Sequence, residues 1–241
     1  MTSRDAWVYG YSKEKVAQNT ERLVQNYNKE LKRLKNIPVN ERKDLLNRKS
    51  DYINWSRKLE RFALNDIELE YHQNHLKLSL YRPFTKKWVY HDKTLNEEAR
   101  LYYNKFGQNN LVINTTGRGA TRDFSPLVVD CIPSNDFMEK GQGFMRYDNE
   151  VDETLLFQNN DNINQSFADK LGLSLDDTFA YVYGLLNSKE YQEKYTNDLK
   201  KDLARIPIVK NKERYVEVGK ALMDLHLNYE EVSVYDGVEI T

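Results

Sequence analysis

The sequence predicts a mixed α/β (α+β) protein with an N-terminal helical hairpin, a central mixed sheet and C-terminal helices. Apolar residues recur at helical spacing over 13–62, alternate with polar residues over 66–90, and return to helical spacing after residue 176. The 241 residues are 39% hydrophobic and 12% aromatic. This is enough for a sizeable core, although the mean hydropathy is only -0.81.

The N-terminal hairpin begins behind Ser12, a residue type that caps helices. Its apolar positions are Val16, Leu23, Val24, Tyr27, Leu31 and Leu34. Pro38 forbids one continuous helix, and Asn40 is placed to cap a second long helix that continues to residue 62. Lys and Arg occupy the outer faces of this hairpin.

The central part of the chain reads mainly as strands. Period-two alternation predicts strands over 67–71 and 76–80, and 81–90 reads as strand, turn and strand with Pro83 opening the turn. A short helix over 94–106 precedes strands at 111–113, 125–132 and 143–147. The rest of 133–175 reads as irregular, because it is rich in Asn, Asp and Gly.

Three helices are predicted in the last third. The first is a largely buried helix over 177–186. Ser188 caps the next, which carries Tyr191, Tyr195 and Leu199 at a spacing of four. The last runs from Tyr215 to Leu225. We interpret the tyrosines of 181–195 as core residues and His226 as a packing residue.

Several function classes are excluded by what the chain lacks. Cys131 is the single cysteine, so we expect neither a disulfide within the chain nor a thiolate zinc cluster, and a cytoplasmic location. No apolar run approaches the ~20 residues of a membrane span. There is no Gly-x-x-x-x-Gly-Lys-Ser/Thr loop for ATP. His72 and His75 lack a third metal ligand at a defined spacing. We expect no enzyme activity, no cofactor, no metal and no membrane.

The charge of the chain is strongly asymmetric. Its formal net charge is -1, from 36 Lys and Arg against 37 Asp and Glu, which taken alone argues against a nucleic-acid partner. Residues 1–120, however, hold 23 basic and 14 acidic side chains, a net +9, whereas residues 121–241 hold 13 and 23, a net -10. Such asymmetry indicates polyanion binding; two solvated faces that merely differ are the alternative.

Basic residues interleave with aromatic ones in the middle of the sequence. Arg82, Lys86 and Lys87 share one predicted strand–turn–strand unit with four aromatic side chains, and the loop 114–122 reads NTTGRGATR. Lys and Arg neutralise phosphates, Arg can bond guanine bidentately, and Asn can bond adenine. The pattern favours DNA binding; an ordinary polar loop on a sheet rim is the alternative.

Four stretches occur in a fixed order along the chain. They are SRDAWVY at 3–9, YRPFTKKWVY at 81–90, YVYGLLNSKEY at 181–191 with its continuation to Pro207, and 222–227, which ends Leu-His-Leu. The last three resemble the C-terminal specificity region of type ISP restriction–modification enzymes. The first resembles the stretch where the methyltransferase core of these proteins ends. The resemblance spans most of the chain.

Such enzymes combine nuclease, ATP-driven translocase, adenine methyltransferase and target-recognition domains in one polypeptide. The resemblance implies a helical coupler with the end of the methyltransferase region at 1–65, and a target-recognition domain at 66–241. It implies double-stranded DNA as ligand, and the methyltransferase and translocase domains of the parent protein as partners. Because the upstream catalytic motifs and the usual C-terminal helical portion are missing, we expect an excised fragment or a truncated gene product.

Target specificity varies within the family, so we expect the base-reading residues in the irregular loops 114–123 and 133–150. We assign Arg118 and Arg122 to base edges. The cations assigned to phosphates are Arg82, Lys86, Lys87 and Lys105. Asn114, Thr116 and Arg146 are secondary candidates. No catalytic or metal-binding residue is predicted.

Two other function classes stay open. A protein–protein docking module would couple a methyltransferase to a translocase through the 13–62 hairpin without reading sequence. Its basic face would then bind an acidic protein surface. An enzyme fragment that retains cofactor binding would be stabilised by S-adenosylmethionine, which we do not expect.

Overall fold

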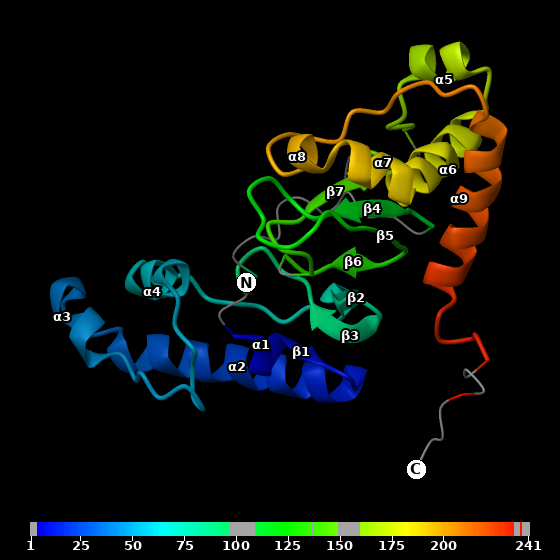
Figure 1. Cartoon of the computed structure of the whole chain (residues 1–241). Coiled ribbons are helices and arrows are strands. Elements are labelled where there is room, and N and C mark those ends of the chain that lie inside the picture. The colour runs from blue at the N-terminus through cyan, green and yellow to red at the C-terminus, as the bar shows by residue number, and fades with distance from the viewer. Residues whose placement is uncertain (1–3, 97–108, 136, 149–159, 234–236, 238–241) are drawn as a thin grey trace. The chain divides into compact units, whose positions relative to one another are not determined.

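The computed structural model describes residues 4–96, 109–135, 137–148, 160–233 and 237 (Figure 1). The chain forms two compact units, residues 1–81 with 85–103, and residues 82–84 with 104–241. Helices and antiparallel strands occur in both units, so the predicted mixed α/β class is confirmed. The predicted functional boundary at residue 65 is a different division from this one and stays a prediction.

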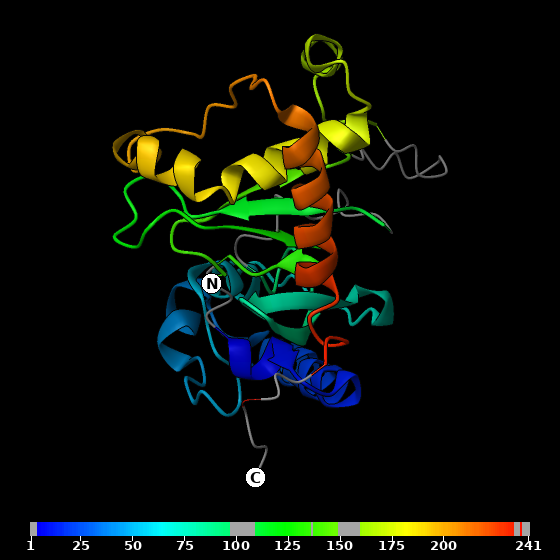
Figure 2. The same cartoon turned by 45° about the vertical axis from the view of Figure 1, so that its right-hand side comes forward.

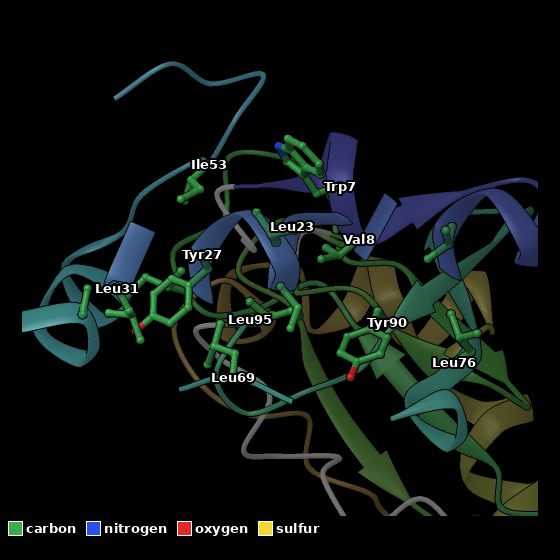
Figure 3. Close-up of a cluster of buried hydrophobic side chains, with 14 residues drawn as sticks. Trp7, Val8, Leu23, Tyr27, Leu31, Ile53, Leu69, Leu76, Tyr90 and Leu95 are labelled. Carbon is green, nitrogen blue, oxygen red and sulfur yellow. The ribbon is translucent and has the colours of Figure 1, made fainter. Parts of the chain in front are cut away.

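The first unit is built around one long helix. Its elements are α1 (Asp5–Val8), β1 (Tyr9–Gly10), α2 (Lys13–Leu34), α3 (Val39–Leu45), α4 (Arg57–Leu64), η1 (Gln73–His75), β2 (Leu76–Arg82) and β3 (Thr85–Tyr90). Ser12 caps α2 as predicted, because its hydroxyl accepts a hydrogen bond from the Lys15 amide at 3.1 Å. The apolar face of α2, including Leu23 and Tyr27, packs against Trp7, Ile53 and other buried side chains (Figure 3).

The predicted second long helix is wrong. Two short helices, α3 and α4, replace it, and residues 46–56 between them are not helical. Side chains take the backbone carbonyls that a helix would use: Trp55 Nε1 donates to Asn47 O at 2.8 Å, and Trp7 Nε1 donates to Ser50 O at 3.2 Å. Asn40 lies inside α3, whose N-cap position is Pro38.

The predicted strand at 67–71 is also wrong, because this segment has no strand partner. Helix α2 binds its backbone instead. Asn28 donates from Nδ2 to Leu69 O at 2.8 Å and accepts from Leu69 N at 3.0 Å, as a strand neighbour would. The hydroxyl of Tyr27 donates to Ile67 O at 2.9 Å. Leu69 and Tyr71 of this segment pack into the core around α2, whereas Ile67 is 43% exposed.

The predicted strand–turn–strand unit at 81–90 is confirmed by β2 and β3, which are neighbours in one sheet. β1 pairs antiparallel with the other edge of β3, so that Tyr9 faces Val89 and Gly10 faces Trp88. This arrangement puts the Lys87 side chain of β3 beside the ring of Tyr81 in β2 and the ring of Tyr11, which follows β1.

The second unit contains an antiparallel sheet in the order β5–β4–β7, with helices packed on one face (Figures 1 and 2). Its strands are β4 (Val112–Thr115), β5 (Pro126–Val129), β6 (Ile132–Pro133) and β7 (Gln142–Met145). Its helices are α5 (Gln165–Leu171), α6 (Leu175–Leu186), α7 (Lys189–Lys194), α8 (Thr196–Leu199) and α9 (Lys212–Leu227). In the sheet, Ile113 lies opposite both Val128 and Phe144.

Helices α6 and α9 cross at two glycines (Figure 2). A Cβ on Gly219 would lie 2.0 Å from the Ala180 carbonyl oxygen, and one on Gly184 would lie 2.2 Å from the Tyr215 carbonyl oxygen. The backbones can approach this closely only because both positions lack a side chain.

Of the four tyrosines predicted as core, Tyr181 and Tyr183 are completely buried and Tyr191 nearly so, whereas Tyr195 is only partly buried. Burial raises the pKa of Tyr183 to about 12. Its hydroxyl accepts a hydrogen bond from Val128 N at 3.2 Å and pairs with His226 Nδ1. The first contact ties α6 to β5 and the second ties α6 to α9, so His226 is a packing residue as predicted.

Three elements of the second unit differ from the prediction. The strand expected over 125–132 is divided into β5 and β6, and the helix after Ser188 breaks at Tyr195 into α7 and α8. Helix α5 lies in a region expected to be irregular, although its Asn164 cap and left-handed Gly172 are ordinary helix signals. Most of the helix expected over 94–106 lies outside the described residues. No described helix is long and apolar enough to cross a bilayer.

Candidate nucleic-acid interface

The loop 116–125 connects β4 to β5 and is closed at its base by one threonine. The hydroxyl of Thr116 accepts a hydrogen bond from the Ser125 amide at 3.1 Å. The same hydroxyl donates a hydrogen bond to Asp123 O at 3.2 Å. The Thr116 amide donates to Ser125 O at 3.1 Å. The loop therefore leaves the sheet as a defined hairpin.

The segment 139–140 holds the far part of this loop. Both carboxylate oxygens of Glu139 accept hydrogen bonds, from the backbone and hydroxyl of Thr121 at 3.0 and 3.1 Å and from Arg122 N at 3.1 Å. Backbone donation from Thr121 and Arg122 lowers the pKa of Glu139 below its usual value. Lys140 Nζ donates to Gly119 O at 2.6 Å. The loop is thus braced by a distant segment of sequence.

An open hollow of about 570 Å³ lies beside the loop, a volume typical of small-ligand sites. It is lined by Arg82, Pro83, Thr116, Thr121, Arg122, Asp123, Ser125, Phe137, Met138 and Glu139. Residues 82–84 belong to the second unit, so the hollow lies within that unit, beside both loops from which base readers were expected. Its lining carries Arg82 and Arg122 together with Asp123 and Glu139.

Arg118 and Arg122, the two residues predicted to read bases, are both exposed on the loop. Neither guanidinium has a hydrogen-bond or ion-pair partner among the described residues. Arg122 lines the hollow, whereas Arg118 lies outside its lining. The five N–H donors of each guanidinium are therefore available for an external acceptor.

Two of the predicted phosphate-binding lysines belong to the first unit. Lys87 Nζ lies 3.9 Å from the centroid of the Tyr81 ring and 4.9 Å from that of Tyr11, whose side chain is exposed. Lys13 Nζ lies 4.8 Å from the Trp88 centroid in the same unit. Lys86 is half-buried on β3. We call the set Tyr11, Tyr81 and Lys87 the lysine–aromatic face; Lys86 and Trp88 lie on the other side of β3, because side chains alternate along a strand.

Two secondary candidates are buried. Arg146 is only 4% exposed, and its guanidinium bonds Asp161 and Asp176, with 2.8 Å from Nη2 to Asp176. Asn114 is also 4% exposed, in the central strand of its sheet, and its Nδ2 has no hydrogen-bond partner among the described residues. Thr116 lines the hollow but is 9% exposed. We therefore do not carry Asn114 and Arg146 forward as DNA contacts, because neither side chain reaches the surface.

The remaining predictions concern residues away from the hollow. Lys105 lies outside the described residues, so it stays a prediction from the sequence. The rings of His72 and His75 lie 5.1 Å apart, and His75 Nδ1 pairs with Asp92 at 3.2 Å. No group of three or more His, Cys, Asp or Glu in the described part of the chain could hold a metal ion.

Sequence reasoning missed Glu139, Phe137 and Ser125 as parts of the hollow. Glu139 contacts residues 17 and 18 positions earlier, and no local pattern marks such a contact. Gly117 offered a partial signal. A Cβ there would lie 1.6 Å from the Lys140 carbonyl oxygen, so the sequence must have glycine where the two segments meet.

Two exposed arginines without a partner among the described residues, on a braced loop, are cationic groups suited to a module that binds a polyanion. The sequence model of the Type ISP C-terminal specificity domain matches residues 1–241, and the chain belongs to this family. This match confirms the family that the four sequence stretches indicate.

Solved structures of related proteins have the same fold. One is a nuclease-deletion mutant of the Type ISP restriction–modification enzyme LlaGI in complex with a DNA substrate mimic. Its sequence is 38% identical and its TM-score is 0.86, and the match covers 99% of this chain and 22% of the LlaGI chain. DrdV in a DNA complex is 29% identical with a TM-score of 0.86, over 98% and 23%. The ATP-dependent Type ISP enzyme LlaBIII, bound to DNA, is 32% identical with a TM-score of 0.84, over 98% and 16%.

The chain therefore spans less than a quarter of each of these three proteins. The search of curated proteins gave no match.

Proposed function

We propose that this chain reads a base sequence in double-stranded DNA and thereby directs methylation and cleavage carried out by other domains of a parent restriction–modification enzyme. Membership of the specificity-domain family supports DNA target recognition, and all three related structures contain DNA or a DNA mimic. The observation that carries the proposal for this chain is the pair of exposed arginines on the braced loop, whose guanidinium groups have no partner in the part of the chain that the structure describes.

The proposal divides the cations into two roles. Arg118 and Arg122 bond base edges, because a guanidinium without an internal partner can form a bidentate pair with guanine in the major groove. Arg82, Lys86 and Lys87 contact phosphates. Arg82 does so from the rim of the hollow, Lys87 from the lysine–aromatic face, and Lys86 from the other side of β3. Lys105 keeps its predicted phosphate role.

The proposal assigns no catalytic residue and no cofactor to this chain. Methylation and cleavage belong to the methyltransferase, translocase and nuclease domains that we expect in the parent protein. A cytoplasmic location, predicted from the single cysteine, is where such an enzyme meets DNA.

The experiment is selection of duplexes from a randomised pool by the purified chain at low salt. We expect one asymmetric motif to be enriched, and the affinity for that motif to fall steeply as salt rises, because counterions are released from neutralised phosphates. Absence of a motif at low salt contradicts sequence reading. A chain that enriches no duplex yet retains a methyltransferase or translocase partner would be the docking module instead.

A further inference from the structure

Glu139 is an acidic side chain in the middle of a proposed DNA-binding site. A carboxylate close to DNA repels phosphates, so a surface that only held the backbone would exclude it. Its presence in the lining of the hollow, between Arg122 and the loop base, therefore requires a role other than affinity.

The contacts of Glu139 indicate that role. Both of its oxygens are occupied by the backbone and hydroxyl of Thr121 and by the backbone of Arg122. The main chain of the same segment holds the start of the loop, because Gly117 N donates to Glu139 O at 3.0 Å. One residue thus fixes both ends of the stretch 117–122.

The direction of the Arg122 side chain depends on this clamp. Its guanidinium has no partner among the described residues, so only its own backbone determines where the side chain starts. Holding the backbone amide of Arg122 removes part of the ordering cost that a free loop would incur on binding. Preorganisation of this kind favours the one base pair that fits, more than it favours DNA in general.

We propose that Glu139 is a positioning residue for sequence reading, which holds the 121–122 backbone so that Arg122 meets one base pair. This proposal rests on the proposed function. Glu139 need not touch DNA, and its negative charge lowers non-specific affinity while its hydrogen bonds raise discrimination.

The test is a double-mutant cycle between Glu139→Gln and Arg122→Ala, measured as the ratio of affinities for the enriched duplex and a scrambled duplex. Glutamine keeps the shape of the side chain but replaces one acceptor oxygen by an N–H₂ group that faces a backbone N–H. We expect Glu139→Gln to reduce the ratio by roughly fivefold or more, since about 1 kcal/mol is lost per hydrogen bond. We expect its affinity for the scrambled duplex to stay equal or to rise.

In the Arg122→Ala background, Glu139→Gln should cause no further loss of discrimination, because it acts through Arg122. Additive losses would overturn the proposal and assign Glu139 a general structural role. Thr121→Ala removes only the hydroxyl bond and should give a smaller loss in the same direction. Glu217→Gln, an exposed glutamate on α9, is the matched control and should change nothing.

The outcomes separate this proposal from the proposed function. If the wild-type chain discriminates between duplexes and Arg122→Ala alters that discrimination while Glu139→Gln does not, only the positioning role fails. If the wild-type chain binds both duplexes equally, the proposed function fails. Unfolding curves of each variant show whether a loss reflects misfolding.

Discussion

Two regions of the second unit each carry an arginine that the sequence marks as a DNA contact, and they hold it in opposite ways. Arg146 is 4% exposed, with its guanidinium bonded to two aspartates. Arg122 is exposed, with its backbone fixed by Glu139 and its guanidinium unpartnered among the described residues. The difference separates an arginine that stabilises the fold from one that is available to a ligand.

The first unit adds a third way of holding a cation. On the lysine–aromatic face, Lys87 lies over the Tyr81 ring, which stabilises a positive charge without neutralising it. A lysine ammonium is a point charge with no planar pattern of donors, so it suits phosphates better than base edges. Position along the sequence does not distinguish these three cases, but the surroundings of each charge do.

Replacement of Arg146 should have the largest effect on stability. Arg146→Ala removes bonds to Asp161 and Asp176, whose side chains are 42% and 77% exposed and can rehydrate, so we expect a loss of roughly 2–3 kcal/mol. Denaturant unfolding followed by far-ultraviolet circular dichroism measures it. Arg146→Met keeps the packed stem and should lose less.

Tryptophan fluorescence provides an internal control for that experiment. Trp7, Trp55 and Trp88 are the chain's three tryptophans, and all lie in the first unit. In the Arg146→Ala chain, the unfolding transition followed by tryptophan fluorescence should shift less than the transition followed by circular dichroism. An Arg146→Ala chain as stable as wild type would mean that this arginine is free in solution.

Gly117→Ala tests the loop itself. The new Cβ would collide with the Lys140 carbonyl oxygen, so the loop must move away from the 139–140 segment. We expect a loss of discrimination at least as large as that of Arg122→Ala, because Arg118 and Arg122 both shift. Competition binding with enriched and scrambled duplexes measures it. Unchanged discrimination between the two duplexes would show that the contact of the loop with the 139–140 segment is irrelevant to sequence reading.

Arg122→Ala should relax the preference at one base pair by roughly tenfold, in line with a bidentate contact of 1–3 kcal/mol. The unfolding free energy should change by less than about 0.5 kcal/mol, as at other exposed sites. Duplexes that each carry one substituted base pair of the motif locate the effect. Arg118→Ala should relax preference at a different base pair, and an equal loss at every position would contradict base reading by either residue.

Lys87→Ala should have the smallest effect, a loss of about threefold that is equal for all sequences. The slope of log affinity against log salt should fall by about one, as expected for a single phosphate contact. Lys86→Ala should behave in the same way. A loss confined to the enriched duplex would move these lysines into the group of base readers.

The sequence predicted those parts of the fold that depend on neighbouring residues. The Ser12 and Ser188 caps and the β2–β3 hairpin are each determined within a few positions. The broken helix after Pro38 was not predictable, because Trp7 takes a carbonyl 43 residues away. Nor was the pairing of Leu69 with Asn28 of α2, 41 residues earlier.

The residues of the candidate site likewise fall into those that a local sequence signal indicates and those that depend on contacts between distant parts of the sequence. Arg118 and Arg122 could be named as candidates because arginines in a glycine-containing loop are a local signal, and their DNA contacts stay a prediction. The burial of Arg146 depends on aspartates 15 and 30 residues further along, and the clamp by Glu139 depends on a contact across 17 residues. Composition cannot reveal such contacts, because they form only when the chain has folded.

Hydrogen–deuterium exchange of the chain with and without its enriched duplex tests the central claim most directly. Amides of 116–125 and 137–141 should exchange more slowly with the enriched duplex, and much less so with a scrambled duplex at the same occupancy. Protection of these two segments that is equal for both duplexes, or protection confined to the first unit, would contradict sequence reading by the braced loop.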